Sequence, residues 1–167
     1  MPGTMKKVFL ITLFTATVLT AFAQYDTIAP VLRSRHLPYF SLLSVDSVAF
    51  NQSVLDTGKH TILMLFNPDC EHCKKQLQRF LSMPEFYISS QLVMISIETV
   101  AKTKHFYNRY HLKDYPFIHI GKDYKRFFIS YFRAETIPVL AFYNTRNELT
   151  LFKQGDVEEN DIREAIK

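Results

Sequence analysis

The two cysteines of the chain, Cys70 and Cys73, stand three residues apart directly after an apolar run, and this arrangement restricts the fold more than any other feature. The run Thr61–Phe66 predicts a strand that is covered on both faces. Residues 70–81 predict a helix. If Cys70 opens that helix, its sulfur lies near unpaired N–H groups and the positive end of the helix dipole, which favour thiolate over thiol. Cys73 follows one turn later, within disulfide reach, so the pair predicts a redox-active dithiol.

Two structural alternatives for the cysteine pair are a set of inert thiols and half of a zinc site. A structural zinc ion takes four ligands, and the chain has no other cysteine. Its six histidines do not show the paired spacing that would complete such a site. We therefore expect no metal and no cofactor, with the chemistry carried by the two sulfurs alone.

The amino terminus predicts export. Met5-Lys6-Lys7 is a short basic start, the segment Val8–Thr20 is almost wholly apolar or threonine, and Ala21-Phe22-Ala23 is a small-x-small cleavage site. An apolar stretch of about 13 residues is too short to span a bilayer, which needs roughly 20. No cysteine follows the cleavage point, so the chain is not expected to be a lipoprotein. We expect a signal peptide over residues 1–23, one domain over residues 24–167, and a periplasmic or secreted location.

Charge gives weaker limits on the partners of the chain. The formal net charge is +4, including the two lysines of the signal peptide, and acids and bases are interspersed. This pattern does not indicate nucleic-acid binding. Basic residues do concentrate between residues 102 and 126, which is typical of a solvated helix face. A patch that steers acidic partners is the alternative.

Periodicity predicts alternating strands and helices. Residues 24–37 have no clear period and are expected to be extended, and residues 51–59 form a loop or a single helical turn. Strands are expected at residues 38–42, 45–50, 61–66, 91–98, 115–120, 139–143 and 148–152, and helices at 70–81, 100–110, 123–132 and 157–166. This order describes an α/β sandwich with a mixed sheet.

The motifs resemble the thioredoxin fold. The resemblance rests on the strand leading into Cys70 and Cys73, the Ile137-Pro138 dipeptide that opens a later strand, and the hairpin, Gly155 and final helix after it. The segment Leu37–Leu42 is similar to the start of the domain in the exported TlpA and ResA group. Residues 70–75 are similar to the start of the helix that carries the cysteines in that group. The resemblance implies a three-layer α/β sandwich with a mixed central sheet and an N-terminal β-hairpin extension. It also implies a cis Ile137-Pro138 bond that faces the dithiol, where its backbone pairs with a bound partner strand.

The chain departs from this family beside the dithiol. The tryptophan usual before the first cysteine is absent, and Asn67-Pro68-Asp69 stands there. The positions of the acids that assist the second thiol in thioredoxin and in ResA-like proteins are occupied here by Met64 and Gln76. Neither side chain can take up a proton. Proton transfer at Cys73 would then need Glu71, Asp69, His72 or water.

The two residues between the cysteines are expected to tune the dithiol in opposite directions. An imidazole at His72 resembles the DsbA-type oxidants, in which it stabilises the thiolate and hence the reduced protein. The Glu71 carboxylate is a like charge beside the thiolate and raises the pKa of the thiol. A solvent-facing role without effect is the alternative for His72.

The function that these residues predict is exported thiol–disulfide exchange. Cys70 attacks a partner disulfide and Cys73 resolves the mixed disulfide. The expected partners are protein thiols and disulfides together with a membrane or periplasmic electron donor. Two alternatives stay open. A peroxiredoxin-like peroxidase would need threonine where Asn67 stands, and a non-catalytic secreted binding module would use the groove at Pro138 for capture without turnover.

Overall fold

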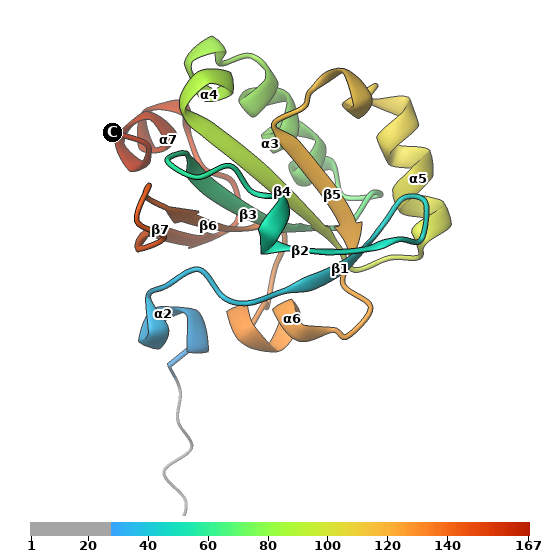
Figure 1. Cartoon of the computed structure of the whole chain (residues 1–167), viewed down its shortest axis with the longest axis horizontal. Helices are drawn as coiled ribbons and strands as arrows, with labels where there is room; N and C mark the ends of the chain where they lie inside the picture. The colour runs from blue at the N-terminus through green and yellow to red at the C-terminus, as the bar shows by residue number, and fades with distance from the viewer. Residues whose placement is uncertain (1–27) are drawn as a thin grey trace, which may run out of the picture.

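The computed structural model describes residues 28–167, so the signal peptide predicted for residues 1–23 lies outside the described residues. A seven-stranded mixed sheet runs through the molecule (Figure 1) in the order β2-β1-β5-β4-β3-β6-β7. Strands β3, β4 and β5 are parallel to one another, whereas β1 and β2 at one edge and β6 and β7 at the other pair antiparallel with their neighbours. The strands are β1 (Ser41–Ser44), β2 (Ala49–Asn51), β3 (His60–Phe66), β4 (Ser90–Ser96), β5 (Ile118–Lys122), β6 (Val139–Tyr143) and β7 (Leu149–Gln154).

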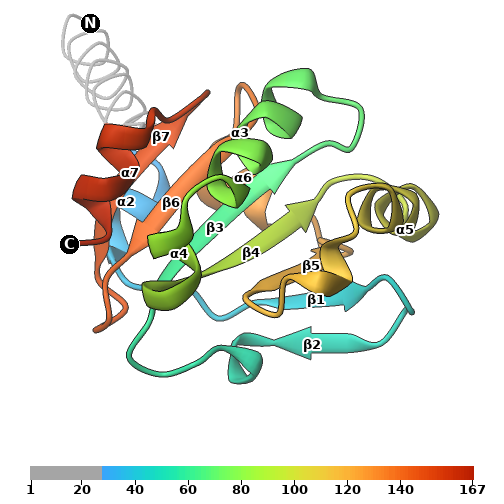
Figure 2. The same cartoon turned by 90° about the horizontal axis from the view of Figure 1, so that it is seen from above.

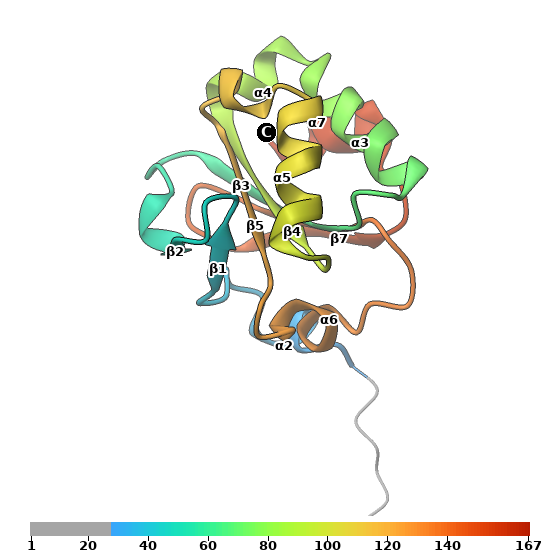
Figure 3. The same cartoon turned by 90° about the vertical axis from the view of Figure 1, so that its right-hand side faces the viewer.

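Helices cover both faces of the sheet, so the predicted three-layer α/β sandwich is confirmed. Figures 2 and 3 show α3, α4, α5 and α7 on one face and α2 with α6 on the other. Among residues 28–167, no helix is long and apolar enough to cross a membrane. The helices are α2 (Pro30–Ser34), α3 (Glu71–Leu81), α4 (Pro84–Ser89), α5 (Val100–Arg109), α6 (Phe127–Phe132) and α7 (Glu159–Ala165), with 3-10 turns at Gln52–Val54 and Leu112–Asp114.

The central strand β3 explains why its sequence is continuously apolar. Successive side chains of a strand point to opposite faces. Ile62, Met64 and Phe66 pack into the core under α3, α4, α5 and α7. Leu63 and Leu65 pack into the second core under α2 and α6. All of β3 is buried, as the prediction of a doubly covered strand requires.

Three helical segments differ from the prediction. Residues 30–34 form α2 instead of an extended lead-in, because Val31 is buried against the core shared with α6. Helix α4 was not predicted. The helix predicted from residue 123 begins only at Phe127, since Arg126 has a φ of 54° and the Asp123 carboxylate accepts the backbone N–H of Phe128. Each difference is set by local turn geometry or by tertiary burial.

The predicted N-terminal hairpin forms and joins the sheet through β5, but its strands are Ser41–Ser44 and Ala49–Asn51 instead of residues 38–42 and 45–50. Residues 45–48 make the turn, which is closed by hydrogen bonds between Ser44 and both Ser47 and Val48.

Strand β1 pairs with β2 on one side and with β5 on the other, where Ser44 lies opposite Gly121. A Cβ atom on Gly121 would lie 2.7 Å from the Phe50 ring and 2.8 Å from the Leu43 carbonyl oxygen. Glycine at this position therefore allows the hairpin to close on the sheet.

We predict that Gly121→Ala lowers the free energy of unfolding by about 1–3 kcal/mol, because the added methyl group meets a backbone atom that cannot move aside. Urea denaturation followed by circular dichroism measures this change. Ala49→Ser is the matched control, since it adds one atom at an exposed position of the same hairpin and should stay within about 0.5 kcal/mol of the wild type. Equal stability of all three proteins would contradict the close contact.

Candidate active site

A tight turn carries the chain from the end of β3 to the first cysteine. The Cys70 N–H donates to the Asn67 carbonyl oxygen at 3.0 Å, and the Asn67 side chain accepts the Asp69 N–H at 2.8 Å. Pro68 stands at the second turn position, where its fixed φ is favourable. The Asn67 amide also donates to Glu98, in the segment after β4. The sequence that replaces the usual tryptophan thus builds the turn that presents Cys70.

Cys70 is the N-cap residue of α3, as the sequence predicts, and the two sulfurs lie in contact. The Cys70 Sγ atom is 2.7 Å from the Cys73 Sγ atom and accepts the Cys73 backbone N–H at 3.2 Å. Cys70 is half-buried, whereas Cys73 has no exposed surface. Burial raises the pKa of the Cys73 thiol far above its usual range, and the Cys70 sulfur and the negative charge of Asp156 raise it further. The two thiols are therefore chemically unequal.

The loop before β6 faces the half-buried sulfur. The Ile137-Pro138 bond is cis, as the family resemblance implies. The Ile137 carbonyl oxygen lies 3.8 Å from the Cys70 Sγ atom. The Gly155 N–H donates to the Pro138 carbonyl oxygen at 2.8 Å, and the Gln154 amide oxygen accepts the N–H groups of Glu135 and Thr136. Strand β7 thus holds this loop beside Cys70.

Side chains on one face of α3 contact the segment that follows β7. His72, Gln76 and Arg79 stand at spacings of four and three, so they share that face. His72 Nδ1 lies 3.1 Å from Asp156 Oδ2, Gln76 Oε1 accepts the Val157 N–H at 2.8 Å, and Arg79 donates to the Val157 carbonyl oxygen at 2.6 Å. These contacts place Asp156, whose side chain is 31% exposed, beside the start of α3.

The other acids proposed near Cys73 are engaged at the surface. Glu71 pairs with Lys74 at 2.5 Å, and Asp69 pairs with Lys102 at 3.1 Å; both acidic side chains are 73% exposed. The hydrogen bond from Lys74 lowers the pKa of the Glu71 carboxyl group. The cation beside Glu71 therefore offsets the charge that we expected to act on the thiolate.

Asp156 was missed by sequence reasoning, and no sequence signal marks it. It is 83 positions from Cys73 along the chain, outside any motif, and His72, which it contacts, is 84 positions away. Only its position after Gly155, a glycine that the family resemblance includes, connects it with the site. The contact arises because β7 ends beside the start of α3.

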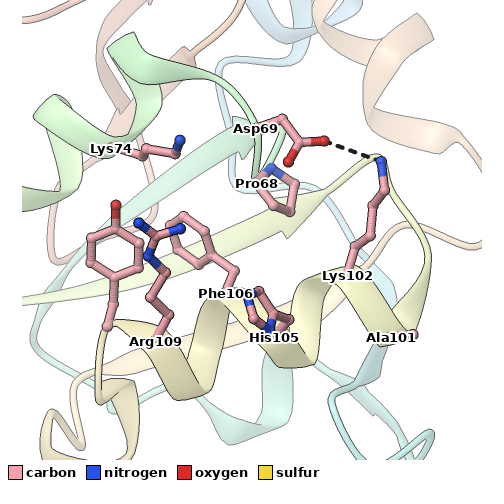
Figure 4. Close-up of a pocket in the computed structure, with 9 residues that line it drawn as sticks. Pro68, Asp69, Lys74, Ala101, Lys102, His105, Phe106 and Arg109 are labelled. Carbon is pink, nitrogen blue, oxygen red and sulfur yellow. Dashed lines mark hydrogen bonds and ion pairs between the residues drawn. The ribbon is translucent and has the colours of Figure 1, made fainter.

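Two hollows flank the turn that presents Cys70, one on each face of the sheet. A basic cleft of about 390 Å³ lies between α3 and α5 (Figure 4). Lys74 and Arg109 face each other across it, and Arg109 has no ion-pair partner among residues 28–167. On the α6 face, an apolar groove of about 230 Å³ lies beside Ile137. The cleft is lined by Pro68, Asp69, Lys74, Ala101, Lys102, His105, Phe106, Arg109 and Tyr110, and the groove by Leu65, Ile97, Ile129, Ala134, Glu135, Thr136 and Ile137.

Metal ligands do not gather at this site. In the part of the chain that the structure describes, no group of three or more histidine, cysteine, aspartate or glutamate side chains is arranged to hold a metal ion. The donor set at the dithiol therefore does not fit a structural zinc ion, which needs four ligands.

Comparison with known proteins identifies the fold. No protein-family model matches the chain, and no curated protein matches its sequence. Among solved structures, the chain is similar to StoA from Bacillus subtilis, with 20% identity, a TM-score of 0.59, and coverage of 78% of this chain and 97% of StoA. A secreted Mycobacterium tuberculosis disulfide oxidoreductase homologous to E. coli DsbE has 16% identity and a TM-score of 0.61, covering 76% and 93%. The exposed lipoprotein thioredoxin Etrx1 of Streptococcus pneumoniae has 18% identity and a TM-score of 0.61, covering 77% and 98%.

These similarities span almost the whole length of the three solved proteins, and they establish that the chain has a thioredoxin-like fold. The fold predicted from the cysteine spacing, the strand order and the Ile137-Pro138 dipeptide is thereby confirmed. At this level of identity the comparison concerns the fold, and the chemistry has to be argued from the site itself.

We predict that iodoacetamide modifies Cys70 at least about tenfold faster than Cys73 in the reduced protein, because Cys73 is buried and its raised pKa keeps it a thiol. The single variants Cys73→Ser and Cys70→Ser isolate each thiol, and mass spectrometry follows the modification. The same variants unfolded in urea are the control and should react at similar rates. Similar rates in the folded proteins would contradict the assignment of the two sulfurs.

Proposed function

We propose that this protein is an exported thiol–disulfide oxidoreductase that exchanges disulfides with partner proteins through Cys70 and Cys73. The observation that carries the proposal is the inequality of two sulfurs in contact at the start of a helix. A half-buried sulfur that accepts a backbone N–H is suited to attack a partner disulfide. A buried neighbouring thiol is protected from partner disulfides and is placed to resolve the mixed disulfide that this attack forms.

The exchange proceeds in two displacements. The Cys70 thiolate attacks one sulfur of a partner disulfide, which forms a mixed disulfide and releases the other partner sulfur as a thiolate. The Cys73 sulfur then loses its proton and attacks the Cys70 sulfur. This forms the Cys70–Cys73 disulfide and releases the second partner thiolate. Two electrons pass from the dithiol to the partner, and the same steps run backwards in oxidation.

The loop at Ile137 and Pro138 supports docking of an extended partner segment beside Cys70. The Ile137 carbonyl oxygen already lies near the Cys70 sulfur, and Gly155 and Gln154 hold the loop in place. Backbone pairing with a sheet edge or loop is a general mode of peptide recognition. In our proposal this loop aligns the partner disulfide, while Glu71 and His72 tune the dithiol.

Export is supported by the pattern of residues 1–23, with its basic start, apolar segment and small-residue cleavage site. Two of the structurally similar proteins are described as a secreted oxidoreductase and an exposed lipoprotein thioredoxin. We propose a periplasmic or secreted location, membership of the TlpA- and ResA-like group, and an electron donor at the membrane or in the periplasm.

The basic cleft supports a preference for acidic partners. Lys74 and Arg109 repel each other across it. Lys74 is paired with Glu71, and Lys102 is paired with Asp69 and Glu98, whereas Arg109 has no ion-pair partner among residues 28–167. An acidic side chain near the partner disulfide would relieve that repulsion. We propose that partner segments carry negative charge on the α5 side of their cysteine and apolar residues on the α6 side.

We predict that the reduced protein catalyses the reduction of insulin by dithiothreitol, and that Cys70→Ser abolishes this turnover. Cys73→Ser should accumulate mixed disulfides with insulin through Cys70, because the resolving sulfur is absent. Turbidity measures turnover and non-reducing electrophoresis measures trapping. Capture of partners without turnover by the wild type would favour a binding module instead, and rapid peroxide consumption would favour a peroxidase.

We predict that the reduced wild type reacts fastest with dithiodipropionate, which is negatively charged, more slowly with the uncharged hydroxyethyl disulfide, and slowest with cystamine, which is positively charged. Arg109→Gln should slow the reaction with dithiodipropionate by about two- to fivefold at low salt, because an exposed ion pair contributes ~0.2–1 kcal/mol, and leave hydroxyethyl disulfide unchanged. Lys125→Gln, outside the cleft, is the control. An equal effect of Arg109→Gln on all three compounds would contradict a charge preference.

A further inference from the structure

Four residues around the turn that presents Cys70 form a closed ring of polar contacts. The Asn67 amide donates to Glu98 Oε1 at 3.1 Å, and Asn67 Oδ1 accepts the Asp69 N–H at 2.8 Å. Lys102 Nζ lies 3.4 Å from Glu98 Oε2 and 3.1 Å from Asp69 Oδ2, and Figure 4 shows the contact with Asp69. Each member of the ring contacts two others. The ring therefore connects the turn after β3 with the start of α5.

Asn67 reaches both cysteines through its backbone. Its carbonyl oxygen accepts the Cys70 N–H at 3.0 Å. A hydrogen bond from its backbone lowers the pKa of the Cys73 thiol and so offsets part of the effect of burial. A shift of Asn67 would therefore move groups that surround both sulfurs. Because the chain has no tryptophan that could pack against this turn, the hydrogen bonds of Asn67 carry more of its positioning.

Glu98, the acceptor for the Asn67 amide, stands on a rigid part of the fold. Its backbone N–H donates to the Ser96 hydroxyl oxygen at 3.2 Å. Ser96 is fully buried and also accepts a hydrogen bond from the Thr103 hydroxyl group of α5 at 2.8 Å. The Glu98 side chain is 26% exposed, so water shields its carboxylate only in part. An acceptor that is fixed in this way can hold a neighbouring loop in one position.

The ring is better suited to fix a position than to stabilise the fold. The side chains of Asp69 and Lys102 are 73% and 52% exposed, and ion pairs at such positions contribute little to stability. The attack of a thiolate on a disulfide depends steeply on placement, because a misplacement of about 1 Å can cost roughly 100-fold in rate. Loss of the ring should therefore change the rate of attack by Cys70 more than the resistance of the protein to unfolding.

We propose that Glu98 is a positioning residue for the attack by Cys70, and that through Asn67 it holds the turn so that the Cys70 sulfur meets the partner disulfide in line. This inference rests on the proposed function. Glu98 forms no bond with the partner. The Cys70 thiolate forms the new bond to one partner sulfur, and the other partner sulfur leaves as a thiolate. Lys102 and Asp69 close the ring and keep the Glu98 carboxylate directed towards Asn67.

Electrostatics and positioning predict opposite effects when the Glu98 carboxylate is removed. Loss of a negative charge near a thiolate favours the thiolate, which would speed the attack by Cys70. Release of Lys102 from Glu98 would act in the same direction. Loss of the acceptor for the Asn67 amide lets the turn move, which slows the attack. The sign of the change in rate therefore separates the two explanations.

The experiment measures the second-order rate at which the reduced protein reacts with hydroxyethyl disulfide, by acid quenching and mass spectrometry. This disulfide is uncharged, so a changed charge in the cleft does not alter its approach. We expect Glu98→Ala to slow the reaction by about tenfold, which is within the effect that a displacement of less than an ångström can have.

The turn between β6 and β7 supplies a matched control. There the Asn144 amide donates to Glu148 Oε2 at 2.9 Å, and Arg146 pairs with the same carboxylate at 2.9 Å. This turn lies at the end of the sheet away from the dithiol, because β6 begins beside the Ile137-Pro138 loop and runs away from it. Glu148→Ala removes the acceptor of an asparagine amide in the same way and should leave the reaction rate unchanged.

An exchange of donor and acceptor tests the contact itself. Asn67→Asp keeps the acceptor for the Asp69 N–H but places a second carboxylate against Glu98, so it should slow the reaction. Adding Glu98→Gln allows the glutamine amide to donate to the aspartate carboxylate. We expect this double variant to regain most of the wild-type rate, although it still carries the added charge beside Cys70.

Four outcomes would overturn the proposal. They are a rate in Glu98→Ala that equals or exceeds that of the wild type, no recovery in the exchanged pair, an equal slowing by Glu148→Ala, and a much larger fall in the urea midpoint for Glu98→Ala than for Glu148→Ala. The last would show a merely structural role. A wild type that reacts with hydroxyethyl disulfide but reduces no insulin would contradict the proposed function instead, and the Glu98 variants would still decide the positioning role.

Discussion

Strand β3 is paired on both edges and covered on both faces, and the geometry of the dithiol depends on this burial. Its pairing with β6 places Leu65 opposite Val139, so that Pro138 lies beside the turn that leaves β3. Its pairing with β4 places Phe66 opposite Ser96, which brings Glu98 to Asn67. A strand that is fixed in register with both neighbours can present a cysteine in one position relative to two loops that are distant in sequence.

Helix α3 makes the two sulfurs chemically unequal, because it exposes Cys70 in part and buries Cys73. Its first residues leave Cys70 at the edge of the fold, and its next turn carries Cys73 into the core. The face formed by His72, Gln76 and Arg79 binds the segment after β7 through side-chain contacts to two successive residues. The same contacts that anchor the helix also place Asp156 beside its start.

The surroundings of Cys70 differ on the two faces of the sheet. Towards α5 the turn borders a cleft with excess positive charge, and towards α6 it borders an apolar groove beside Ile137. In the function that we propose, recognition by charge on one side and by apolar contact on the other supplies specificity without a tryptophan next to the nucleophile.

The strand into Cys70, the helix that begins there, the later strands and the fold that they form could be predicted from the amino-acid sequence, because these depend on local periodicity, capping and cysteine spacing. The sequence also identified the Ile137-Pro138 loop through its family resemblance. The sequence did not reveal α2 and α4. These short helices are stabilised by burial of Val31 in one hydrophobic core and of Phe86 in the other. Nor did the sequence reveal Asp156, which approaches α3 only when β7 pairs with β6. Contacts between segments more than 80 residues apart are decided by sheet register and packing, and no local pattern encodes them.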